Sequence, residues 1–524
     1  MSRRAGEKRF SDSPIPRLFD SKIKKIMSKT FVACILVILT LTQGCVETEP
    51  PPEPPSEASA NRDVVVHLFE WKWTDVAQEC ETFLGPKGYK AVQVSPPTEN
   101  AVVEEPMRPW WERYQPASYT LDNRSGNRAA FADMVARCKA AGVDIYVDAI
   151  LNHMTGAYAG VGTAGTAFGL YDYPGLYSYD DFHHCGLTEG DEIQVWDDPV
   201  QVTTCELVNL TDLDTGAEKV QARLAEYLND LRSLGVAGFR LDAARHVAAA
   251  EITAILDRVE GDPYVYQEVI DPDPPTWAEQ YYPNGTVTEF RYSAVVSEVF
   301  YNGPLTRLHG AGSIWEEVGF LPSANAFVFI DNHDNQRGHG AGGHIVTHKD
   351  GDLYNLAVAF MLAYPYGRPR VMSSYAFEED WQGPPADADY ATRSVHNGDT
   401  VDCFGDTWQC EHRRPTIAGM VGFNNATAST VEVANWWTGS TNQIAFSRGD
   451  RGFIVINRDD AGLDTTLQTG LPAGTYCNVT EGDLTEDGQG CTGGTVSVGN
   501  DGMASVFVGP MQALAIHVGA KVGG

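Results

Sequence analysis

The chain has 524 residues, of which 43% are hydrophobic and 21% are charged, and this balance excludes a mainly disordered protein. Its 70 acidic residues outnumber the 38 basic residues and give a formal net charge of -32. A surface this acidic repels phosphates and anionic lipids, so we expect no nucleic-acid partner and no polybasic membrane docking. The length predicts roughly two to four domains.

An export signal is predicted near the N-terminus. Four lysines between Lys22 and Lys29 precede the apolar run Phe31–Leu41, which has the length of a signal-peptide core and is too short to cross a bilayer comfortably. Gly44 and Cys45 then resemble a bacterial lipoprotein processing site, so residues 1–45 are interpreted as a signal region with lipid attachment at Cys45. Ordinary cleavage nearby, an uncleaved anchor and a start at Met27 instead of Met1 stay open.

The segment 46–61 is predicted to be a linker. It reads VETEPPPEPPSEASAN, with five prolines, four glutamates and almost no apolar side chains. Such a segment cannot bury a core and should be extended and solvated. If Cys45 carries lipid, the linker would hold the following domain away from a membrane tether.

The middle of the chain alternates predicted strands with predicted helices. Helical periodicity covers Asn127–Ala141, Glu218–Leu234 and Ala248–Val259. This alternation predicts a parallel sheet, and eight strands predict a closed (β/α)8 TIM barrel over residues 62–430. The predicted strands are Val64–Phe69, Ala91–Val94, Asp144–Asp148, Gly238–Asp242, Tyr264–Glu268, Thr286–Phe290, Ala326–Ile330 and Arg370–Met372.

Two regions depart from this alternation. Leu151–Thr215 is rich in Gly, Tyr and Asp, has no clear helix, and is too long for a loop, so it predicts an inserted subdomain at about 153–214, after the third strand. Beyond residue 431, short alternating strands are separated by Gly, Asn and Asp turns. Residues 431–524 are therefore predicted to form a separate C-terminal all-β sandwich domain.

Three predicted strands deliver an acid at the end where barrel enzymes place their chemistry. Asp242, Glu268 and Asp334 each follow an apolar stretch. A single acid at a strand end is more often a cap or turn residue, but three on one barrel converge on the same mouth. Like charges in one cleft push at least one pKa upward and can set a general acid beside a nucleophile, the minimum for retaining glycoside hydrolysis.

Aromatic residues agree with a sugar substrate. Trp110, Trp111 and Tyr114 lie in a polar loop after the second predicted strand and could stack on sugar faces. A local core cluster is the alternative interpretation.

Four segments resemble the signature segments of alpha-amylases in glycoside hydrolase family 13: Val147–His153, Gly238–His246, Gln267–Asp271 and Ile330–Asp334. The resemblance runs from about residue 63 to the C-terminus and is closer to the chloride-dependent, animal-type members. The segments that carry this closer resemblance are His67–Trp73, Trp110–Pro116, Gly338–Gly343, Arg370–Tyr375 and Gly470–Cys477.

The resemblance implies a role for each acid. Asp242 would be the nucleophile that forms a covalent glycosyl intermediate, and Glu268 would protonate the leaving oxygen and then deprotonate water. Asp334 would hold the distorted sugar ring. Arg245 stands where the animal enzymes usually have Lys. The implied substrate-binding residues are Trp110, Trp111, Tyr114, Gln115, Asp148, His153, Arg245, His246 and His333.

The resemblance also implies two bound ions. Calcium would be held by Asn152, Asp212 and the carbonyls of Thr203 and His246, an oxygen-only set that suits a hard cation. The alternative for Asp212 is a helix cap. Chloride would be held by Arg240, Asn332 and Arg370.

Eight of the ten cysteines allow 105 pairings once Cys34 and Cys45 are set aside. The family resemblance favours pairing of near neighbours, and export makes oxidation plausible. The implied disulfides are Cys80–Cys138, Cys185–Cys205, Cys403–Cys410 and Cys477–Cys491.

Together these observations predict an extracellular or bacterial cell-surface lipoprotein, a monomer that hydrolyses internal α-1,4 bonds of starch-like or glycogen-like glucans with retention of configuration. A transglycosylase or maltogenic enzyme on the same scaffold is the first alternative, and the sequence does not separate the two. A glycan-binding lipoprotein without catalysis is the second, and it predicts a missing acid, whereas Asp242, Glu268 and Asp334 are all present.

Overall fold

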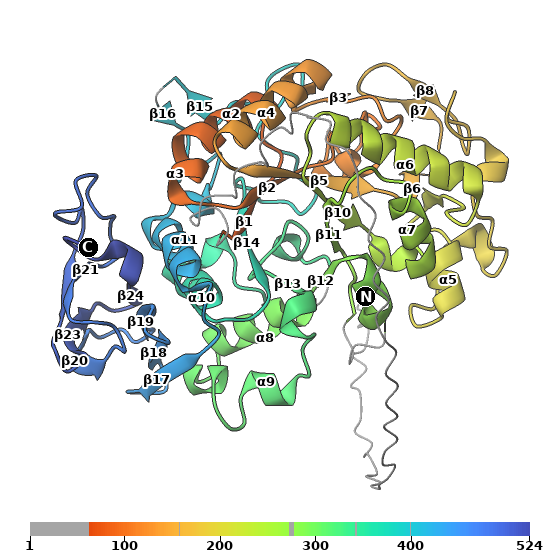
Figure 1. Ribbon diagram of the computed structural model, residues 1–524. Helices are drawn as coiled ribbons and strands as arrows, with labels where there is room; N and C mark the ends of the chain where they lie inside the picture. The colour runs from red at the N-terminus through yellow and green to blue at the C-terminus, as the bar shows by residue number, and fades with distance from the viewer. Residues whose placement is uncertain (1–61, 157, 272–276, 341–342, 399) are drawn as a thin grey trace, which may run out of the picture. The chain divides into compact units, whose positions relative to one another are not determined.

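The computed structural model describes residues 62–156, 158–271, 277–340, 343–398 and 400–524 (Figure 1). The predicted signal region, the lipid attachment at Cys45 and the linker 46–61 lie outside the described residues. Among the helices that are described, none combines the length and the apolar character needed to cross a membrane.

Eight parallel strands form a closed barrel, which confirms the predicted fold class (Figure 1). Their order around the barrel is β1-β14-β13-β12-β11-β10-β5-β2, and pairing of β2 with β1 closes it. Each strand overlaps one of the eight predicted from sequence. The strands are β1 (Val65–Leu68), β2 (Ala91–Val94), β5 (Asp144–Ile150), β10 (Gly238–Asp242), β11 (Tyr264–Gln267), β12 (Thr286–Thr288), β13 (Ala326–Val328) and β14 (Arg368–Ser373).

The barrel strands read as apolar runs because side chains on both of their faces are buried. Every residue of β1, β2 and β10 is buried. Gly238 opens β10 where a Cβ atom would lie 2.5 Å from the carbonyl oxygen of Tyr264, so only glycine fits this close strand approach.

Helices alternate with the strands and surround the barrel (Figure 1). The three helices predicted from periodicity are present as α4 (Arg128–Ala140), α6 (Glu218–Ser233) and α7 (Ala249–Leu256). In α6, Val220, Leu224, Leu228 and Leu231 recur at intervals of three or four residues and are fully buried, which explains why this segment forms an amphipathic helix. The helices around the barrel are α2 (Trp73–Glu79), α3 (Gly85–Lys87), α4 (Arg128–Ala140), α6 (Glu218–Ser233), α7 (Ala249–Leu256), α8 (Phe290–Tyr301), α9 (Ile314–Glu317), α10 (Asp352–Ala363) and α11 (Pro415–Thr427).

The segment after β5 forms short antiparallel pairs, as expected of an insertion. One helix, α5 (Pro199–Thr204), was not predicted there. Asp198 caps it by accepting from Val200 N at 3.0 Å, and Pro199 occupies its first turn. Six residues are too few for helical periodicity to be read from sequence. The strand pairs are β6 (His153–Gly156) with β9 (Leu210–Asp212), and β7 (Gly160–Val161) with β8 (Ala167–Phe168).

The C-terminal part is all-β and has its own core, built from residues such as Phe453, Tyr476, Val506 and Ile516. Its β24 contacts α10 and α11. The four-stranded sheet has the order β17-β18-β19-β24, with β17 (Val433–Thr438), β18 (Gln443–Arg448), β19 (Gly452–Asn457) and β24 (Gln512–His517). Two pairs accompany it: β20 (Leu463–Gln468) with β23 (Met503–Val508), and β21 (Gly474–Cys477) with β22 (Thr495–Val498).

Two further two-residue pairs lie outside these sheets. They are β3 (Asp122–Asn123) with β4 (Gly126–Asn127), and β15 (His396–Asn397) with β16 (Thr400–Val401). Four disulfides join near neighbours in the chain: Cys80–Cys138, Cys185–Cys205, Cys403–Cys410 and Cys477–Cys491.

Candidate active site

The three acids predicted from the strand ends lie together at one end of the barrel. Asp242 is the last residue of β10, Glu268 directly follows β11, and Asp334 lies in the loop after β13. All three line a single cavity of about 300 Å³. The carboxyl ends of parallel strands meet at one mouth, and this is why residues distant in sequence converge there.

One buried guanidinium connects the acids. Arg240 is 2% exposed. Its Nη1 lies 2.7 Å from Asp242 Oδ1 and 2.6 Å from Asp148 Oδ1, and its Nη2 lies 2.6 Å from Glu268 Oε1. Arg240 and Asp242 are two residues apart on β10, so both side chains point into the barrel. Arg240 therefore supplies one positive charge that three carboxylates share inside the barrel.

A left-handed residue completes the contacts of Glu268. Ala243 follows β10 with a φ of 47°, and its N–H donates to Glu268 Oε2 at 2.8 Å. Glu268 thus accepts a backbone hydrogen bond on one oxygen and an ion pair on the other. Both contacts are those of a carboxylate in its ionised form.

Burial dominates the titration of the remaining acids. It raises the pKa of Asp334 to about 7 and holds the pKa of Asp242 well above its usual range, with the charge on Glu268 adding to both shifts. Burial also raises the pKa of Asp148, against the opposing pull of Arg240. Several carboxyl groups share one desolvated cleft, so they cannot all be ionised without cost.

Burial favours the neutral form of two of the three histidines expected to meet substrate, His153 and His333. Burial lowers the pKa of His153 to about 4 and the pKa of His333 well below its usual range. The ring of His333 stacks on Tyr114 at 5.2 Å, and its Nε2 lies 3.3 Å from Asp334 Oδ2. His153 Nε2 lies 2.9 Å from the carbonyl oxygen of Tyr114, so donation from His153 to a sugar hydroxyl would compete with this contact.

The predicted aromatic residues line the cavity in different ways. Trp110 is 6% exposed, donates from Nε1 to the carbonyl of Asp380 at 2.8 Å, and packs against Phe69. Trp111 is half-buried and lines two cavities. Trp110 therefore belongs partly to the local core, and Trp111 offers the more open ring for stacking.

Two further cavities share lining residues with the central cavity. A cavity of about 580 Å³ shares Trp111 and Tyr114 with the central one and also includes Gln115. A third, of about 340 Å³, shares Glu268 with the central cavity and includes Arg245 and His246. The cavity that holds the three acids therefore adjoins two further cavities.

Arg245 and His246 are held by backbone carbonyls at the 340 Å³ cavity. Arg245 donates to Ile270 O at 2.7 Å and to Trp196 O at 2.8 Å, and its guanidinium lies 5.0 Å from the ring centroid of Trp277. His246 Nδ1 lies 3.1 Å from Val202 O. Both side chains are therefore fixed at the edge of the groove.

The residues expected to hold calcium lie on two pairs of segments, and the two segments of each pair are in contact. Asn152 precedes β6 and Asp212 ends β9, which pairs with β6. Thr203 lies on α5, which contacts the Ala244–His246 turn. Among the described residues, no group of three His, Cys, Asp or Glu side chains suited to a metal is found. The expected set has one carboxylate and otherwise uses amide and carbonyl oxygens.

The residues expected to hold chloride are only partly brought together. Arg240 pairs with carboxylates, and Asn332 Nδ2 donates to Asp334 Oδ2 at 3.2 Å. Arg370 is 2% exposed and donates from Nη1 to Gln93 Oε1 at 2.7 Å, whereas its Nε and Nη2 are buried without a hydrogen-bond partner. Two unsatisfied donors on a buried cation fit an anion.

Sequence reasoning missed several residues of this site. Gln93 connects Asp148, Tyr266 and Arg370, with Nε2 donating to Asp148 Oδ2 at 3.1 Å. A glutamine inside the apolar strand Ala91–Val94 was an available signal, because a buried polar side chain needs partners. Arg337 was also missed; it donates to His333 O at 2.7 Å and lies 4.1 Å from the Phe377 ring centroid.

A closed (β/α)8 barrel with buried carboxylates at the carboxyl ends of its strands, in a groove lined by aromatic residues, defines a glycoside hydrolase. Comparison with known proteins identifies the family. The model of the alpha-amylase catalytic domain matches residues 87–300, and that of the alpha-amylase C-terminal all-beta domain matches residues 436–519.

Relatives match over most of the chain. Pancreatic alpha-amylase of Sus scrofa is 46% identical, covering 89% of this chain and 96% of the relative, and alpha-amylase 1B of Homo sapiens is 46% identical with the same coverage. The crystal structure of alpha-amylase I from Eisenia fetida is 42% identical, with a TM-score of 0.80 over 87% of this chain and 97% of that one. The chain belongs to the alpha-amylase family and is an enzyme that hydrolyses internal α-1,4 bonds of glucans.

The comparisons contradict the expected localisation. The sequence predicts an extracellular or cell-surface lipoprotein of a bacterium, but the relatives from Sus scrofa, Mus musculus, Homo sapiens and Eisenia fetida are animal enzymes and speak against a bacterial lipoprotein. The prediction rested on Gly44 and Cys45 after an apolar run, a short pattern that carries little information beside identity over most of the chain.

Proposed function

We propose that the enzyme retains the α configuration through a covalent intermediate on Asp242. The observation that carries this proposal is the shared guanidinium. Asp242 Oδ1 and Glu268 Oε1 contact neighbouring nitrogens of Arg240 at 2.7 and 2.6 Å. One guanidinium that spans both carboxyl groups favours the short separation of retaining enzymes, about 5 Å, over the wider spacing that admits a water between them.

In the first step a carboxylate oxygen of Asp242 attacks the anomeric carbon while Glu268 gives its proton to the glycosidic oxygen. The bond to the leaving sugar breaks, and its hydroxyl keeps that proton. In the second step Glu268, now a carboxylate, takes a proton from water, and the water oxygen displaces Asp242. Two displacements at one carbon restore the original configuration.

Asp334 and the neutral histidine beside it would hold the distorted ring. Asp334 accepts from Asn332 and lies 3.3 Å from His333 Nε2, so one carboxylate oxygen is already oriented by the protein. An oriented acceptor that strengthens its hydrogen bonds as the ring flattens stabilises the transition state more than the ground state. Arg337 donates a hydrogen bond to the carbonyl oxygen of His333 and so helps to hold this loop in place.

We also propose a chloride site beside Glu268. Glu268 must carry a proton before the first step, yet Arg240 and the Ala243 N–H both stabilise its ionised form. Bound chloride would supply a counter-charge to Arg240 and Arg370. Arg240 would then hold Glu268 less strongly, and Arg370 would satisfy its unpaired Nε and Nη2.

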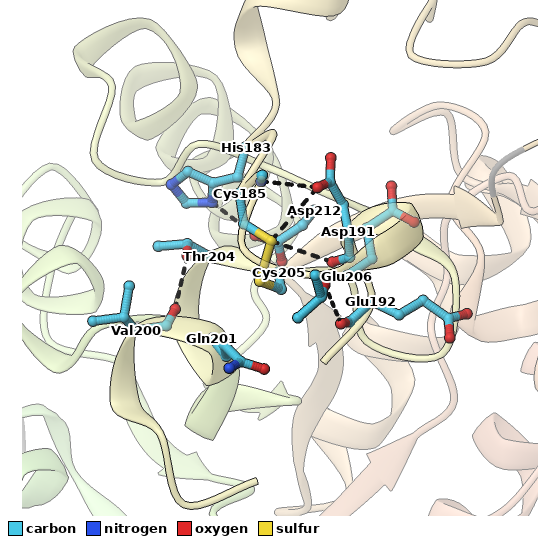
Figure 2. The surroundings of a disulfide bond; sticks show 12 residues. His183, Cys185, Asp191, Glu192, Val200, Gln201, Thr204, Cys205, Glu206 and Asp212 are labelled. Carbon is cyan, nitrogen blue, oxygen red and sulfur yellow. Dashed lines mark hydrogen bonds and ion pairs between the residues drawn. A yellow bond between two sulfur atoms is a disulfide. The ribbon is translucent and has the colours of Figure 1, made fainter. Parts of the chain in front are cut away.

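We further propose a calcium site that joins the insertion to the barrel. Burial raises the pKa of Asp212 to about 7, and its Oδ2 lies 2.7 Å from His183 Nδ1 (Figure 2). A buried carboxylate, an amide and two carbonyl oxygens would make a ligand set that suits a hard cation. Bound calcium would supply the charge that keeps Asp212 ionised; Asn152, Thr203 and His246 would complete the oxygen set.

The test of retention is the configuration of the first product. Proton NMR during early hydrolysis of a malto-oligosaccharide should show the α anomer before mutarotation mixes the two forms. Release of the β anomer would assign Asp242 to general-base chemistry and would contradict the covalent intermediate.

Four disulfides agree with export of the enzyme into an oxidising compartment.

A further inference from the structure

A buried glutamine inside the barrel forms hydrogen bonds in two directions. Gln93 lies on β2 and is fully buried. Its Oε1 accepts from the Tyr266 hydroxyl and from Arg370 Nη1, each at 2.7 Å, and its Nε2 donates to Asp148 Oδ2 at 3.1 Å. These bonds connect a buried cation with a buried carboxylate that belongs to a different part of the site.

The side-chain amide of Gln93 is held in one orientation by its charged partners. Arg370 has donors and no acceptor, and an ionised Asp148 has acceptors and no donor. Turning the amide over would place its NH₂ group against the guanidinium and its oxygen against the carboxylate. Arg370 and Asp148 therefore fix the amide between them, and a change in the position of one partner is felt at the other.

On one side, Gln93 holds a guanidinium whose donors are only partly used. Within the part of the chain that the structure describes, Arg370 donates from Nη1 to Gln93, whereas its Nε and Nη2 have no hydrogen-bond partner. Nε and Nη2 share one edge of the planar guanidinium fork, away from Nη1. A single hydrogen bond fixes this plane less firmly than contacts on two edges. An anion on the open edge would therefore also fix the donor that faces Gln93 Oε1.

On the other side, Gln93 supports an aromatic ring of the groove. Asp148 is fully buried, and its Oδ2 accepts from Gln93 and also from the Tyr114 hydroxyl, at 3.0 Å. Tyr114 lines both the cavity that holds the three acids and the 580 Å³ cavity, and its ring stacks on His333 at 5.2 Å. Asp148 thus links the position of Gln93 to an aromatic ring that can pack against a sugar.

We propose that Gln93 is a positioning residue that couples the anion site at Arg370 to the Tyr114 ring, so that a bound anion tightens the binding of the glucan. Gln93 acts through Asp148 and takes no part in bond cleavage. The inference rests on the proposed chloride site and names the route by which the anion acts on substrate affinity. Coupling between two binding sites is reciprocal, so the glucan should tighten chloride binding by the same factor.

The test measures the dissociation constant of maltoheptaose by calorimetry, in halide-free buffer and at saturating chloride. Every protein carries Glu268→Gln, so that the glucan is bound but not cleaved and any coupling does not run through the proton of Glu268. In this parent, chloride should tighten maltoheptaose binding about fivefold, at the lower end of common coupling strengths. Gln93→Met keeps the length of the side chain but has no amide, and it should reduce the factor to below about 1.5-fold.

Tyr266→Phe is the matched control. It removes one donor to Gln93 Oε1 but leaves the contacts that run from Arg370 through Gln93 to Asp148. Its chloride effect should stay within about twofold of that of the parent. Gln93→Glu keeps an acceptor for Arg370 but replaces the donor to Asp148 by an oxygen. It should lose the coupling as Gln93→Met does, and it keeps the proposal testable if Gln93→Met does not fold.

A second readout separates coupling from a purely structural role of Gln93. Chloride titrated into the parent with and without maltoheptaose should show the same fivefold factor, because the coupling is reciprocal. In the Gln93 variants the two chloride affinities should agree within about 1.5-fold. If Gln93 only satisfied buried polar groups, Gln93→Met would lower the melting temperature and leave both factors unchanged.

A chloride effect of parental size in Gln93→Met or Gln93→Glu, or its equal loss in Tyr266→Phe, would overturn the proposal. A parent that binds chloride without any change in maltoheptaose affinity would also overturn it. A failure of the proposed chloride site gives a different result: chloride titrated into the wild-type enzyme would show no binding, whatever residue occupies position 93.

Discussion

Arg240 provides the sharpest test of how the carboxylates coexist inside the barrel. The substitution Arg240→Gln removes the positive charge that contacts Asp148, Asp242 and Glu268 at 2.6 to 2.7 Å. Because Arg240 is only 2% exposed, water does not take the place of its charge beside the carboxylates. Removing one partner of a buried ion pair typically costs about 3–5 kcal/mol, since the opposite charge is left uncompensated.

The expected fall in melting temperature follows from chain length. An unfolding entropy of about 2.1 cal/mol/K per residue, over roughly 460 folded residues, amounts to about 1 kcal/mol per degree. The substitution should therefore lower the melting temperature by about 3–5 °C. Calorimetry in buffers of fixed calcium and chloride concentration measures this directly.

The loss should also depend on pH. Burial already raises the pKa values of Asp148 and Asp242, and Arg240 opposes both shifts. A carboxyl group whose native pKa exceeds its unfolded value, about 3.9, binds more protons in the native state, so stability falls as pH rises toward the native pKa. Without Arg240 these native pKa values rise further, and the deficit in melting temperature should be larger at pH 8 than at pH 5.

Arg128→Gln is the control, because Arg128 forms an exposed pair with Asp230, with side-chain exposures of 48% and 39%. Exposed pairs contribute about 0–1 kcal/mol. The reasoning would be refuted if Arg240→Gln were no more destabilising than Arg128→Gln, or if its deficit were larger at pH 5 than at pH 8.

Three other predictions concern the ions and a buried network. EDTA should lower the melting temperature and excess calcium should restore it, since a ligand of the native state stabilises by mass action; an unchanged melting curve in metal-free enzyme would remove calcium from Asn152 and Asp212. Chloride added to halide-free enzyme should raise kcat and move the alkaline limb of the pH–rate profile to higher pH. Arg370→Gln should abolish this response while keeping some activity. Identical wild-type profiles with and without chloride would contradict the chloride site. Glu79→Gln should destabilise the fold by about 3–5 kcal/mol. Glu79 is fully buried, and its contacts with His396, His412 and Arg413 hold its pKa far below the usual range. A change in melting temperature below 1 °C would show that these contacts contribute little to stability.

The barrel could be predicted from sequence because its signals are local. Each strand is a short buried run, and α4, α6 and α7 carry regular periodicity. Asp242 and Glu268 could be singled out because strand ends converge in any barrel. Neither step needs knowledge of a distant contact.

The electrostatic organisation of the site could not be predicted in the same way. Gln93 contacts Asp148 and Arg370, 55 and 277 residues away, and such distances leave no periodic signal in sequence. Arg240 was expected to be an anion ligand, whereas the structure shows it paired with three carboxylates.

The central claim is that Glu268 transfers the proton that breaks the glycosidic bond, and the most direct measurement is the rate of reducing-sugar release from starch by Glu268→Gln. The substitution keeps size and hydrogen bonding but removes the transferable proton. We predict a fall in kcat of at least roughly 10³-fold, within the range of about 10²–10⁴ for general acid catalysis. Glu279→Gln, which changes an exposed acid of a nearby segment, should retain wild-type activity. Near-wild-type hydrolysis by Glu268→Gln would contradict the account.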